Sequence, residues 1–399
     1  MNQLLTDNEQ RATIECMGMR PSMVALSLKA RPDLRPQVVA TQVDCRQRMA
    51  KKVPSWAAVQ SLFYPAVVNT EQCSSEELAV WHASLMEGVS ALDLTGGIGA
   101  DTYFFAQKMK QVVYVEQSAE LCQAVSHNYA ALNVSNVKIC NDTAESFLSS
   151  NPSADNIFID PSRRASNGKR VYCIADCTPD VCWLASEMLR VAPNVLIKLS
   201  SMLDIDDICR SLPCVSDIYI AGSRVECKDI VVRLRRDFQA LEPQIHAVYI
   251  TSVGSWSELT FSKSQELNAL PMSSATPVVG HVLYEPSAVL MKAGPYRLIS
   301  QKYGIAPIAA NTHLFTSPTD IEGFMGKKFL IRATYEFGKR GIKSLMQNVK
   351  NASVVVRNFT LSAEVLRKRL KVGESDSDYI FGVSTSDKKY MLIWAKRIG

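Results

Sequence analysis

The most informative stretch of this sequence is a glycine-rich segment that follows a short apolar run. Residues 92–101 read Leu-Asp-Leu-Thr-Gly-Gly-Ile-Gly-Ala-Asp. The pattern predicts a strand over 89–94, a turn, and a helix over 100–109. Because glycine has no side chain, a ligand can lie directly against the backbone of such a turn and the first amides of the helix.

A second feature points to a nucleotide. Glu116 ends the next predicted strand, 17 residues after Gly99. A carboxylate at this position can accept hydrogen bonds from the hydroxyl groups of a ribose. The turn alone is compatible with a purely structural role, but the turn and Glu116 together predict a site for an adenosine-containing ligand.

Between residues 89 and 235, predicted strands and helices alternate. This alternation predicts an α/β domain with a mostly parallel sheet and right-handed crossovers. Ligands of such sheets bind beyond the carboxyl ends of the strands. Strands are expected at 89–94, 112–116, 136–140, 156–160, 194–198, 215–221 and 228–235, and helices at 100–109, 118–132, 178–191 and 203–211.

Acidic residues follow the third and fourth strands. Asp142 suits the amine and ring nitrogens of an adenine, although it could equally cap the following helix. Asp160 and Pro161 end the fourth strand, where the proline stiffens the turn and the carboxylate can accept hydrogen bonds from an amine. The alternative here is a capped turn followed by two solvated arginines, Arg163 and Arg164.

Basic residues extend this segment. With Lys169 and Arg170, the two arginines give four cations within residues 163–170. A basic loop beside a ligand site suits contacts with the phosphate backbone of a nucleic acid.

The C-terminal part of the chain is strongly basic. Residues 324–399 hold 16 Lys and Arg against 6 Asp and Glu, a net charge of +10, whereas the whole chain carries +5. The excess favours a polyanionic partner such as nucleic acid, and a solvated basic surface is the alternative. This module is expected to be α+β, with strands at 328–336, 352–357, 379–384 and 390–394 and helices at 342–348 and 362–370.

The composition is that of a globular protein. No apolar run approaches the ~20 residues of a membrane span, and the N-terminus does not resemble a signal peptide, so a cytoplasmic protein is expected. The eleven cysteines include no Cys-x-x-Cys pair and are expected to be reduced thiols. Neither the cluster of Cys173, Cys177 and Cys182 nor the histidines have the spacing of a metal site, and no metal is expected.

Taken together, these strand ends resemble the class I S-adenosylmethionine-dependent methyltransferases. The resemblance rests on the strand–Asp-x-Thr-Gly-Gly-x-Gly–helix segment, the acid that ends strand two, Asn-Asp after strand three and Ile-Asp-Pro after strand four. Within this class the chain resembles a bacterial branch that carries a THUMP-like domain. The segments similar to that branch are 71–76, 198–204, 226–229, 282–294, 311–316, 354–362 and 364–370.

The resemblance implies a Rossmann-like methyltransferase sheet with S-adenosylmethionine as cofactor and structured RNA (tRNA or rRNA) as partner. Apolar residues recur at helical spacing over 37–43, which predicts a mainly helical N-terminal region at 1–87. The resemblance implies the methyltransferase domain at 88–240, a small ferredoxin-like domain at 241–323 and a basic THUMP-like domain at 324–399. The cofactor-binding residues would be Asp93, Thr95, Gly96, Gly97, Gly99, Glu116 and Asp142. Asp160, Pro161 and Arg163 would face the methyl acceptor, and the RNA would contact Arg164, Lys169, Arg170, Lys198, Arg367 and Lys368.

One departure from the class concerns the acceptor. Amino-methylating relatives follow Asp-Pro or Asn-Pro with proline and an aromatic residue that stacks on the target base, whereas Ser162 and Arg163 occupy these places here. An arginine plane can also stack on a base. Arg163 further resembles enzymes that methylate C5 of pyrimidines, but these need a cysteine nucleophile, for which Cys173, Cys177 and Cys214 are the candidates.

Lys198 ends the fifth strand and has three candidate partners, namely Asp160, a phosphate group and Asp204. The sequence as a whole favours methyl transfer from S-adenosylmethionine to a base amine of structured RNA. The alternatives are a non-catalytic RNA-binding protein that retains the cofactor fold and a methyltransferase that acts on DNA or protein. A nicotinamide-dependent oxidoreductase fits less well, because Thr-Gly-Gly-x-Gly departs from its Gly-x-Gly-x-x-Gly turn.

Overall fold

The computed structural model describes residues 4–162, 173–223 and 226–398. The chain forms two compact units. The first unit comprises residues 1–219, 229–243 and 252–255, and the second comprises residues 220–228, 244–251 and 256–399. The finer division into four domains stays a prediction.

The first unit begins with helices, as the sequence predicts. They are α1 (Asp7–Glu15), α2 (Pro21–Ser27), α3 (Pro36–Lys52), α4 (Val67–Gln72) and α5 (Glu76–Ser84), with a short 3-10 helix at Pro54–Trp56. Two side-chain amides bind the chain that follows α3. Gln42 exchanges hydrogen bonds of 2.7 and 3.2 Å with the backbone of Tyr64, and Asn128 exchanges bonds of 2.9 and 2.8 Å with the backbone of Phe63. The helical region is thereby attached to the helix that carries Asn128.

A nine-stranded sheet follows, with the strand order β3-β2-β1-β4-β5-β7-β6-β8-β9. The neighbouring strands β3, β2, β1, β4 and β5 run parallel to one another, and β7 is antiparallel to β5. The strands are β1 (Ser90–Asp93), β2 (Gln111–Glu116), β3 (Val137–Asn141), β4 (Asn156–Ile159), β5 (Asn194–Ser200), β6 (Val215–Gly222), β7 (Cys227–Arg235), β8 (Gln244–Ser252) and β9 (Ser255–Phe261). The order reverses between β1 and β4, and such a reversal opens a crevice beyond the strand ends.

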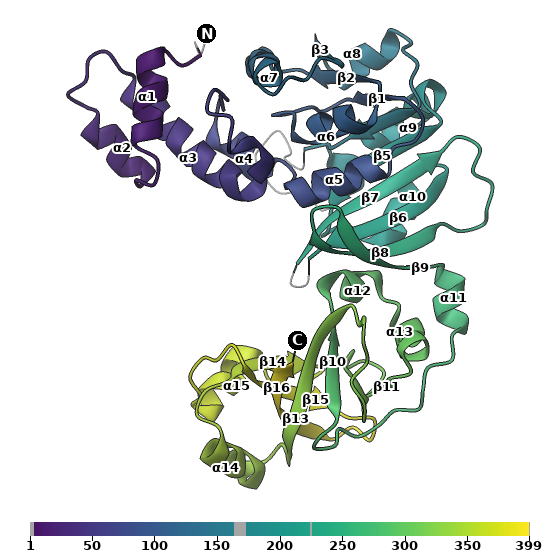
Figure 1. The fold of residues 1–399 in the computed structure, drawn as a ribbon. Helices are drawn as coiled ribbons and strands as arrows, with labels where there is room; N and C mark the ends of the chain where they lie inside the picture. The colour runs from purple at the N-terminus through teal and green to yellow at the C-terminus, as the bar shows by residue number, and fades with distance from the viewer. Residues whose placement is uncertain (1–3, 163–172, 224–225, 399) are drawn as a thin grey trace. The chain divides into compact units, whose positions relative to one another are not determined.

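Helices cover both faces of this sheet (Figure 1). They are α6 (Ala100–Lys108), α7 (Ala119–Ala131), α8 (Ala144–Ser149), α9 (Val181–Val191) and α10 (Ile205–Ser211). Helix α5 packs on α6, and α8 packs on α9. The predicted α/β alternation from residue 89 to 235 is confirmed, whereas β8 and β9 were not predicted.

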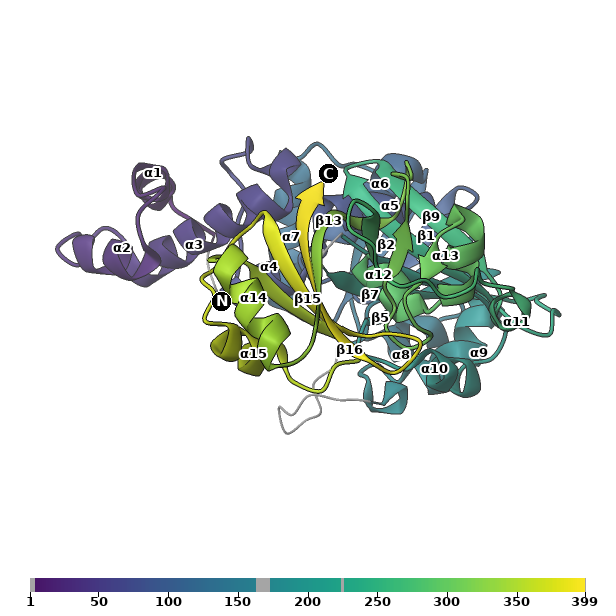
Figure 2. The ribbon, with the colours of Figure 1, turned by 90° about the horizontal axis from the view of Figure 1, so that it is seen from below.

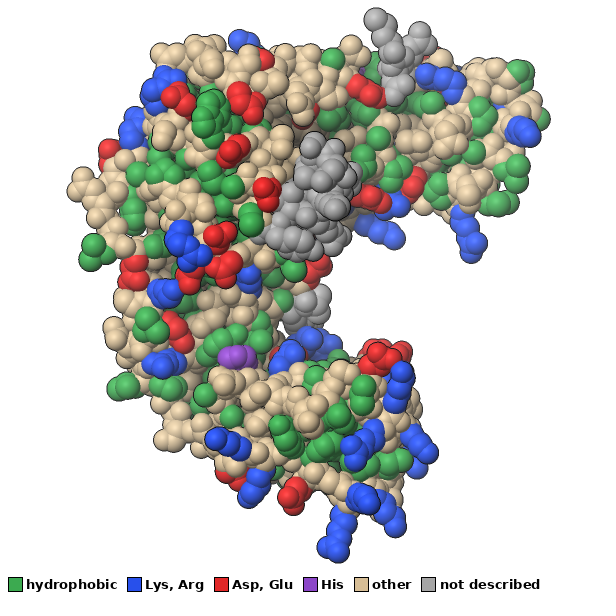
Figure 3. Space-filling view, turned by 180° about the vertical axis from the view of Figure 1, so that it is seen from behind, with side chains coloured by type: hydrophobic (Ala, Val, Ile, Leu, Met, Phe, Trp, Pro, Cys, Tyr) green, Lys and Arg blue, Asp and Glu red, His purple; other side chains and the backbone are tan. Residues whose placement is uncertain are grey.

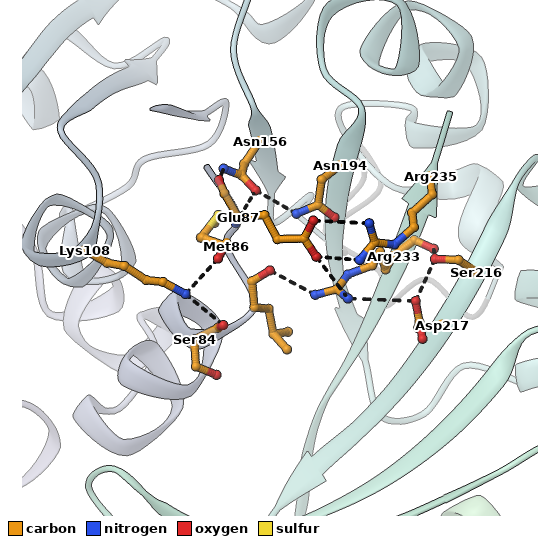
Figure 4. Close-up of polar contacts among 11 residues, drawn as sticks. Ser84, Met86, Glu87, Lys108, Asn156, Asn194, Ser216, Asp217, Arg233 and Arg235 are labelled. Carbon is orange, nitrogen blue, oxygen red and sulfur yellow. Dashed lines mark hydrogen bonds and ion pairs between the residues drawn. The ribbon is translucent and has the colours of Figure 1, made fainter. Parts of the chain in front are cut away.

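The loop between α5 and β1 is fixed by side chains from several elements (Figure 4). Lys108 and Arg233 donate hydrogen bonds to the backbone carbonyl groups of residues 84–86. The backbone N–H of Glu87 donates to Asn156 Oδ1 at 2.9 Å. These bonds fix the residues that lead into β1, and they therefore help to position the glycine-rich turn that follows β1.

The second unit contains a seven-stranded sheet with the order β11-β12-β10-β13-β16-β15-β14. Its strands are β10 (Val282–Pro286), β11 (Ala306–Pro307), β12 (Phe315–Ser317), β13 (Gly326–Glu336), β14 (Ser353–Arg357), β15 (Asp378–Ser384) and β16 (Tyr390–Ile398). Its helices are α11 (Lys263–Asn268), α12 (Ala288–Ala293), α13 (Tyr296–Tyr303), α14 (Lys339–Asn348) and α15 (Ala363–Leu370). Helices α14 and α15 lie on one face of the sheet (Figure 2) and share a core with it.

Candidate functional site

The glycine-rich turn lies at the switch point of the sheet, and two of its three glycines have no room for a side chain. A Cβ atom on Gly96 would overlap the ring of Tyr114, and one on Gly99 would lie 2.5 Å from the Tyr129 hydroxyl. Gly99 has a φ of 80° and is the N-cap of α6. The two tyrosine hydroxyls donate hydrogen bonds to the carbonyl oxygens of Gly97 (2.6 Å) and Gly99 (2.8 Å). The turn is thus held from the protein side by two buried phenols.

Glu116 is bound to the same turn. Its Oε2 accepts a hydrogen bond from the backbone N–H of Gly97 at 3.1 Å, and its Oε1 accepts one from Ser118 N–H at 2.9 Å. Each carboxylate oxygen has lone pairs for a further donor. The contacts fix the position of the carboxylate and leave it able to accept bonds from a ligand.

Asp93 lies beneath the turn and is only 1% exposed. The Thr102 hydroxyl donates to it at 2.5 Å, and the backbone N–H of Thr95 donates at 3.2 Å. Burial raises the pKa of Asp93 to about 7, against the opposing effect of these hydrogen bonds. A cationic ligand group nearby would favour the ionised form of this carboxyl.

Asp142 follows β3 and is half-buried. Its backbone N–H donates to the carbonyl oxygen of Glu116 at 3.2 Å, which ties the ends of β2 and β3 together. The interpretation of Asp142 as a helix cap is wrong, because Thr143 is the N-cap of α8 and its hydroxyl accepts the bond from Ser146 N–H. The carboxylate of Asp142 therefore does not cap α8.

Asp160 connects the turn to the end of β4. Its backbone N–H donates to the Thr95 hydroxyl at 2.6 Å. Pro161 is buried, and Ser162 forms backbone hydrogen bonds of 2.7 and 3.0 Å with Thr178. The predicted residues Arg163, Arg164, Lys169 and Arg170 lie outside the residues that the structure describes.

Lys198 lies within the protein next to Asp160. It is 7% exposed, and its Nζ lies 2.7 Å from Asp160 Oδ2. Asp204 caps α10 instead. Of the three partners considered from the sequence, Asp160 is therefore the one that pairs with Lys198 in the structure. Burial alone would lower the pKa of Lys198, but the carboxylates of Asp160, Asp229 and Asp101 together raise it above its ordinary value.

Four other polar residues near Asp160 were not named as site residues. They are Ser74, His82, Asp101 and Asp229. Ser74 lies in segment 71–76, which the sequence places near the ligand because the helix that follows it leads directly into the first strand, whereas Asp229 lies in segment 226–229, which the resemblance singles out without a role. The sequence gives His82 no role, since a lone histidine carries no signal for a partner far away in the sequence.

The C-terminal cations differ in their surroundings. Arg367 and Lys368 on α15 form ion pairs of 2.8 and 2.7 Å with Glu374 and Glu364. Three exposed cations on α14 have no ion-pair partner within the described part of the chain, namely Lys339, Arg340 and Lys343. Lys and Arg side chains gather on the surface of this part of the second unit (Figure 3).

Among the described residues, no group of three or more His, Cys, Asp and Glu side chains could hold a metal ion. None of the described helices has both the length and the apolar character needed to cross a membrane. A pocket of about 630 Å³ lies in the second unit, and none of the predicted site residues lines it. Its lining includes Leu259, Phe261, Gln265, Asn268, Leu298 and Lys302.

Comparisons with known proteins bear on the whole chain. A ferredoxin-like domain family matches residues 283–324, and a THUMP domain-like family matches residues 326–397. The crystal structure of a putative methyltransferase from Porphyromonas gingivalis W83 aligns over 100% of both chains, with 28% identity and a TM-score of 0.86. A comparison with curated proteins gives no significant match.

Two further solved structures align with a part of the chain. An rRNA methylase from Streptococcus thermophilus covers 40% of this chain and 93% of its own, with 15% identity and a TM-score of 0.30. TrmN from Thermus thermophilus covers 40% of this chain and 47% of its own, with 16% identity and a TM-score of 0.30. These partial likenesses are too weak to bear on function. The predicted fold class, a methyltransferase sheet with ferredoxin-like and THUMP-like C-terminal modules, is confirmed by the full-length match and the two family matches.

Proposed function

We propose that this chain, which has a methyltransferase fold followed by ferredoxin-like and THUMP-like modules, transfers a methyl group from S-adenosylmethionine to a base amine of structured RNA. The observation that supports the proposal most directly is the position of Asp160. It follows β4 at the switch point of the sheet, and its backbone is hydrogen-bonded to Thr95 of the glycine-rich turn at 2.6 Å. A donor held by the turn and an acceptor held by Asp160 would therefore be adjacent.

The residues around the turn suit S-adenosylmethionine by their chemistry. The ligand offers hydrogen-bond donors in its ammonium group, its ribose hydroxyls and its adenine amine, and it carries a positive sulfonium. Asp93, Glu116 and Asp142 provide carboxylate oxygens, which only accept hydrogen bonds when ionised. In this assignment Asp93 would hold the ammonium group directly or through water, Glu116 would bind the ribose and Asp142 the adenine, while Thr95, Gly96, Gly97 and Gly99 would enclose the methionine end.

When bound, the cofactor supplies a methyl carbon made electrophilic by the adjacent sulfonium. Asp160 accepts a hydrogen bond from the acceptor's N–H, which orients the nitrogen lone pair toward that carbon. On methyl transfer the nitrogen would carry a surplus proton, which would pass to the Asp160 carboxylate or to water. Alignment of donor and acceptor supplies much of the rate in this type of reaction.

The RNA partner is proposed from charge and from the THUMP-like module. Residues 324–399 carry a net charge of +10, and positive surfaces of this kind bind phosphate backbones with a strong salt dependence. Pro161 and Arg163 would complete the acceptor side, and Arg164, Lys169 and Arg170 would contact the backbone.

Nucleoside mass spectrometry of RNA from a strain that lacks the gene tests the proposal. One methylated nucleoside should disappear and return when the gene is restored. Asp160→Ala should restore less than a tenth of the methylation while S-adenosylmethionine still binds in calorimetry. If no RNA modification changes while labelled methyl groups enter DNA or protein, the acceptor is wrong. If nothing is labelled but RNA and cofactor both bind, the chain is a non-catalytic RNA-binding protein.

A further inference from the structure

A chain of buried polar side chains leads away from Asp160. The Lys198 ammonium lies 2.7 Å from Asp160 Oδ2 and donates a hydrogen bond to Ser74 Oγ at 3.1 Å. The Ser74 hydroxyl donates to Asp101 Oδ2 at 2.7 Å. Asp101 Oδ1 lies 2.8 Å from His82 Nδ1. Five residues are thereby connected, two of them from α5 and the residues just before it, and one each from α6, the end of β4 and β5.

The far end of this network is His82, which is completely buried. Its Nε2 lies 3.6 Å from Asp229 Oδ2, and neither of these two atoms has a hydrogen-bond partner within the described residues. Asp229 lies on β7 opposite Ser200 of β5, two residues beyond Lys198. The network therefore spans the elements on both sides of β5.

Burying an ammonium group is costly unless charges and hydrogen bonds compensate it. Here Lys198 is compensated by the nearby carboxylates and by Ser74, which is 4% exposed. The network also gathers residues from segments 71–76, 198–204 and 226–229, to which the cofactor site assigns no role. Segments 198–204 and 226–229 also meet where β5 pairs with β7, and the network adds segment 71–76 to them.

The two oxygens of the Asp160 carboxylate differ. Lys198 occupies Oδ2, whereas Oδ1 has no hydrogen-bond partner among the described residues. The side chain is 37% exposed, and its backbone is fixed by Thr95. One oxygen is thus held by the protein interior, and the other is available to a substrate.

We propose that Lys198, supported by Ser74, Asp101 and His82, is a positioning residue that holds Asp160 as an ionised carboxylate and thereby selects an acceptor whose nitrogen carries hydrogen. The inference rests on the proposed methyl transfer and deepens it. An ionised carboxylate only accepts hydrogen bonds. It pairs with an exocyclic amine and repels a carbonyl oxygen or an unprotonated ring nitrogen, so a neutral Asp160 would lose this selection.

Several charges determine the ionisation of Asp160. Burial raises the pKa of its carboxyl, and the Lys198 ammonium opposes that rise. Removing the ammonium should therefore raise the pKa of Asp160 further and reduce the ionised fraction at neutral pH. Among the described residues, the other charged or titratable groups that face this region are Cys73, Asp93, Asp101, Asp229 and His82.

The decisive comparison is Lys198→Met against Lys198→Arg, with Lys198→Gln as a second uncharged variant that retains a hydrogen-bond donor. The dissociation constant for S-adenosylmethionine should stay within about threefold in calorimetry, because Lys198 contacts the acceptor side. In the uncharged variants the acid limb of the kcat profile should move up by about one unit, so kcat on that limb should fall by up to about tenfold while kcat on the alkaline plateau changes much less. Lys198→Arg should retain most of the wild-type profile.

A carbon-13 NMR titration of labelled aspartate carboxyl groups, with the Asp160 resonance assigned by Asp160→Asn, gives a readout without turnover. Asp160 should titrate at higher pH in Lys198→Met and Lys198→Gln than in the wild type. An unchanged titration, or a kcat lowered equally at every pH, overturns the inference. If the titration moves as expected but the wild type methylates no RNA, the proposed function fails while the positioning of Asp160 stands.

Discussion

At the scale of single residues, the glycine-rich turn depends on two tyrosines as much as on its glycines. Tyr114 and Tyr129 are buried and donate hydrogen bonds to backbone carbonyl groups of the turn. They occupy the space where side chains on Gly96 and Gly99 would lie. Gly97 differs, because a Cβ atom there would meet only the Thr95 carbonyl oxygen, at an ordinary contact distance of 3.9 Å, and only its φ of 56° favours glycine.

Gly96→Ala and Gly97→Ala form a matched pair that separates these effects. Gly96→Ala should lower the free energy of unfolding by about 1–3 kcal/mol through overlap with Tyr114, and it should weaken S-adenosylmethionine binding. Gly97→Ala should cost only about 1 kcal/mol, from backbone strain. Urea unfolding and calorimetry measure both. Equal stability of the two variants would contradict the close approach of Tyr114.

Asp93 should make stability depend on pH. Its folded pKa of about 7 lies above the ~3.9 of an unfolded aspartate. Between these values the folded state holds a proton that the unfolded chain has released, so the free energy of unfolding falls as pH rises from about 4 to 7. Asp93→Asn cannot ionise and should lack this decline, which amounts to at most about 4 kcal/mol at pH 8.

Urea unfolding of the wild type and Asp93→Asn between pH 5 and 8 checks this prediction. The free energy of unfolding of Asp93→Asn minus that of the wild type should increase as the pH rises. The asparagine of the variant also changes the hydrogen bonds at this position, but that effect shifts the difference in free energy of unfolding by the same amount at every pH. A difference that does not vary with pH would mean that Asp93 titrates at its ordinary value.

At the scale of elements, α14 and α15 both present cations but with different neighbours. The α15 cations Arg367 and Lys368 are paired with glutamates. Surface ion pairs are worth about 0–1 kcal/mol, yet the adjacent carboxylates also repel a phosphate. The cations of α14 have no such acidic partners in the described part of the structure, so they are better placed for RNA.

The double variants Lys339→Gln/Arg340→Gln on α14 and Arg367→Gln/Lys368→Gln on α15 remove equal charge. The α14 variant should bind RNA more weakly and should reduce the slope of log K against log salt by about 1–2 units. The α15 variant should change the slope by less than about half a unit. Fluorescence anisotropy over a range of salt concentrations measures both. An equal or larger effect on α15 would place the RNA there, as the sequence suggested.

At the scale of the whole molecule, the residues that match the THUMP-like family share their sheet and their hydrophobic core with residues outside the match. Strand β13 at the start of residues 326–397 pairs with β10, from Val282↔Leu330 to Pro286↔Gly326. The core beneath this pairing includes Leu283, Ile308 and Leu314, all outside that family match. A fragment limited to the match would expose an edge strand and lack three buried aliphatic side chains.

Residues 326–398 alone should therefore fold poorly, whereas residues 280–398 should unfold cooperatively. Three fully buried aliphatic residues are worth about 5–9 kcal/mol, which is comparable with the entire stability of a small domain. Thermal unfolding followed by near-ultraviolet circular dichroism distinguishes the two fragments. A cooperative transition in the shorter one would show that the THUMP-like module is independent of β10.

The sequence by itself determined the alternation from residue 89 to 235, the glycine-rich turn and the acids that end successive strands. These features depend on short-range periodicity, and the carboxyl ends of parallel strands necessarily meet at one edge of the sheet. It also predicted the elements of the C-terminal module to within a few residues. The roles of the cofactor and acceptor residues stay predictions.

Only the tertiary structure placed Lys198 between Asp160 and Ser74, and His82 between Asp101 and Asp229. Ser74 and Lys198 are 124 residues apart, and they meet because β4 and β5 are neighbours in the sheet and α5 packs on α6. Strand order and helix packing follow from burial of the whole chain, which no local pattern encodes. A buried lysine, a serine and a histidine look like ordinary structural residues in sequence, and it is their convergence on Asp160 that gives them a chemical meaning.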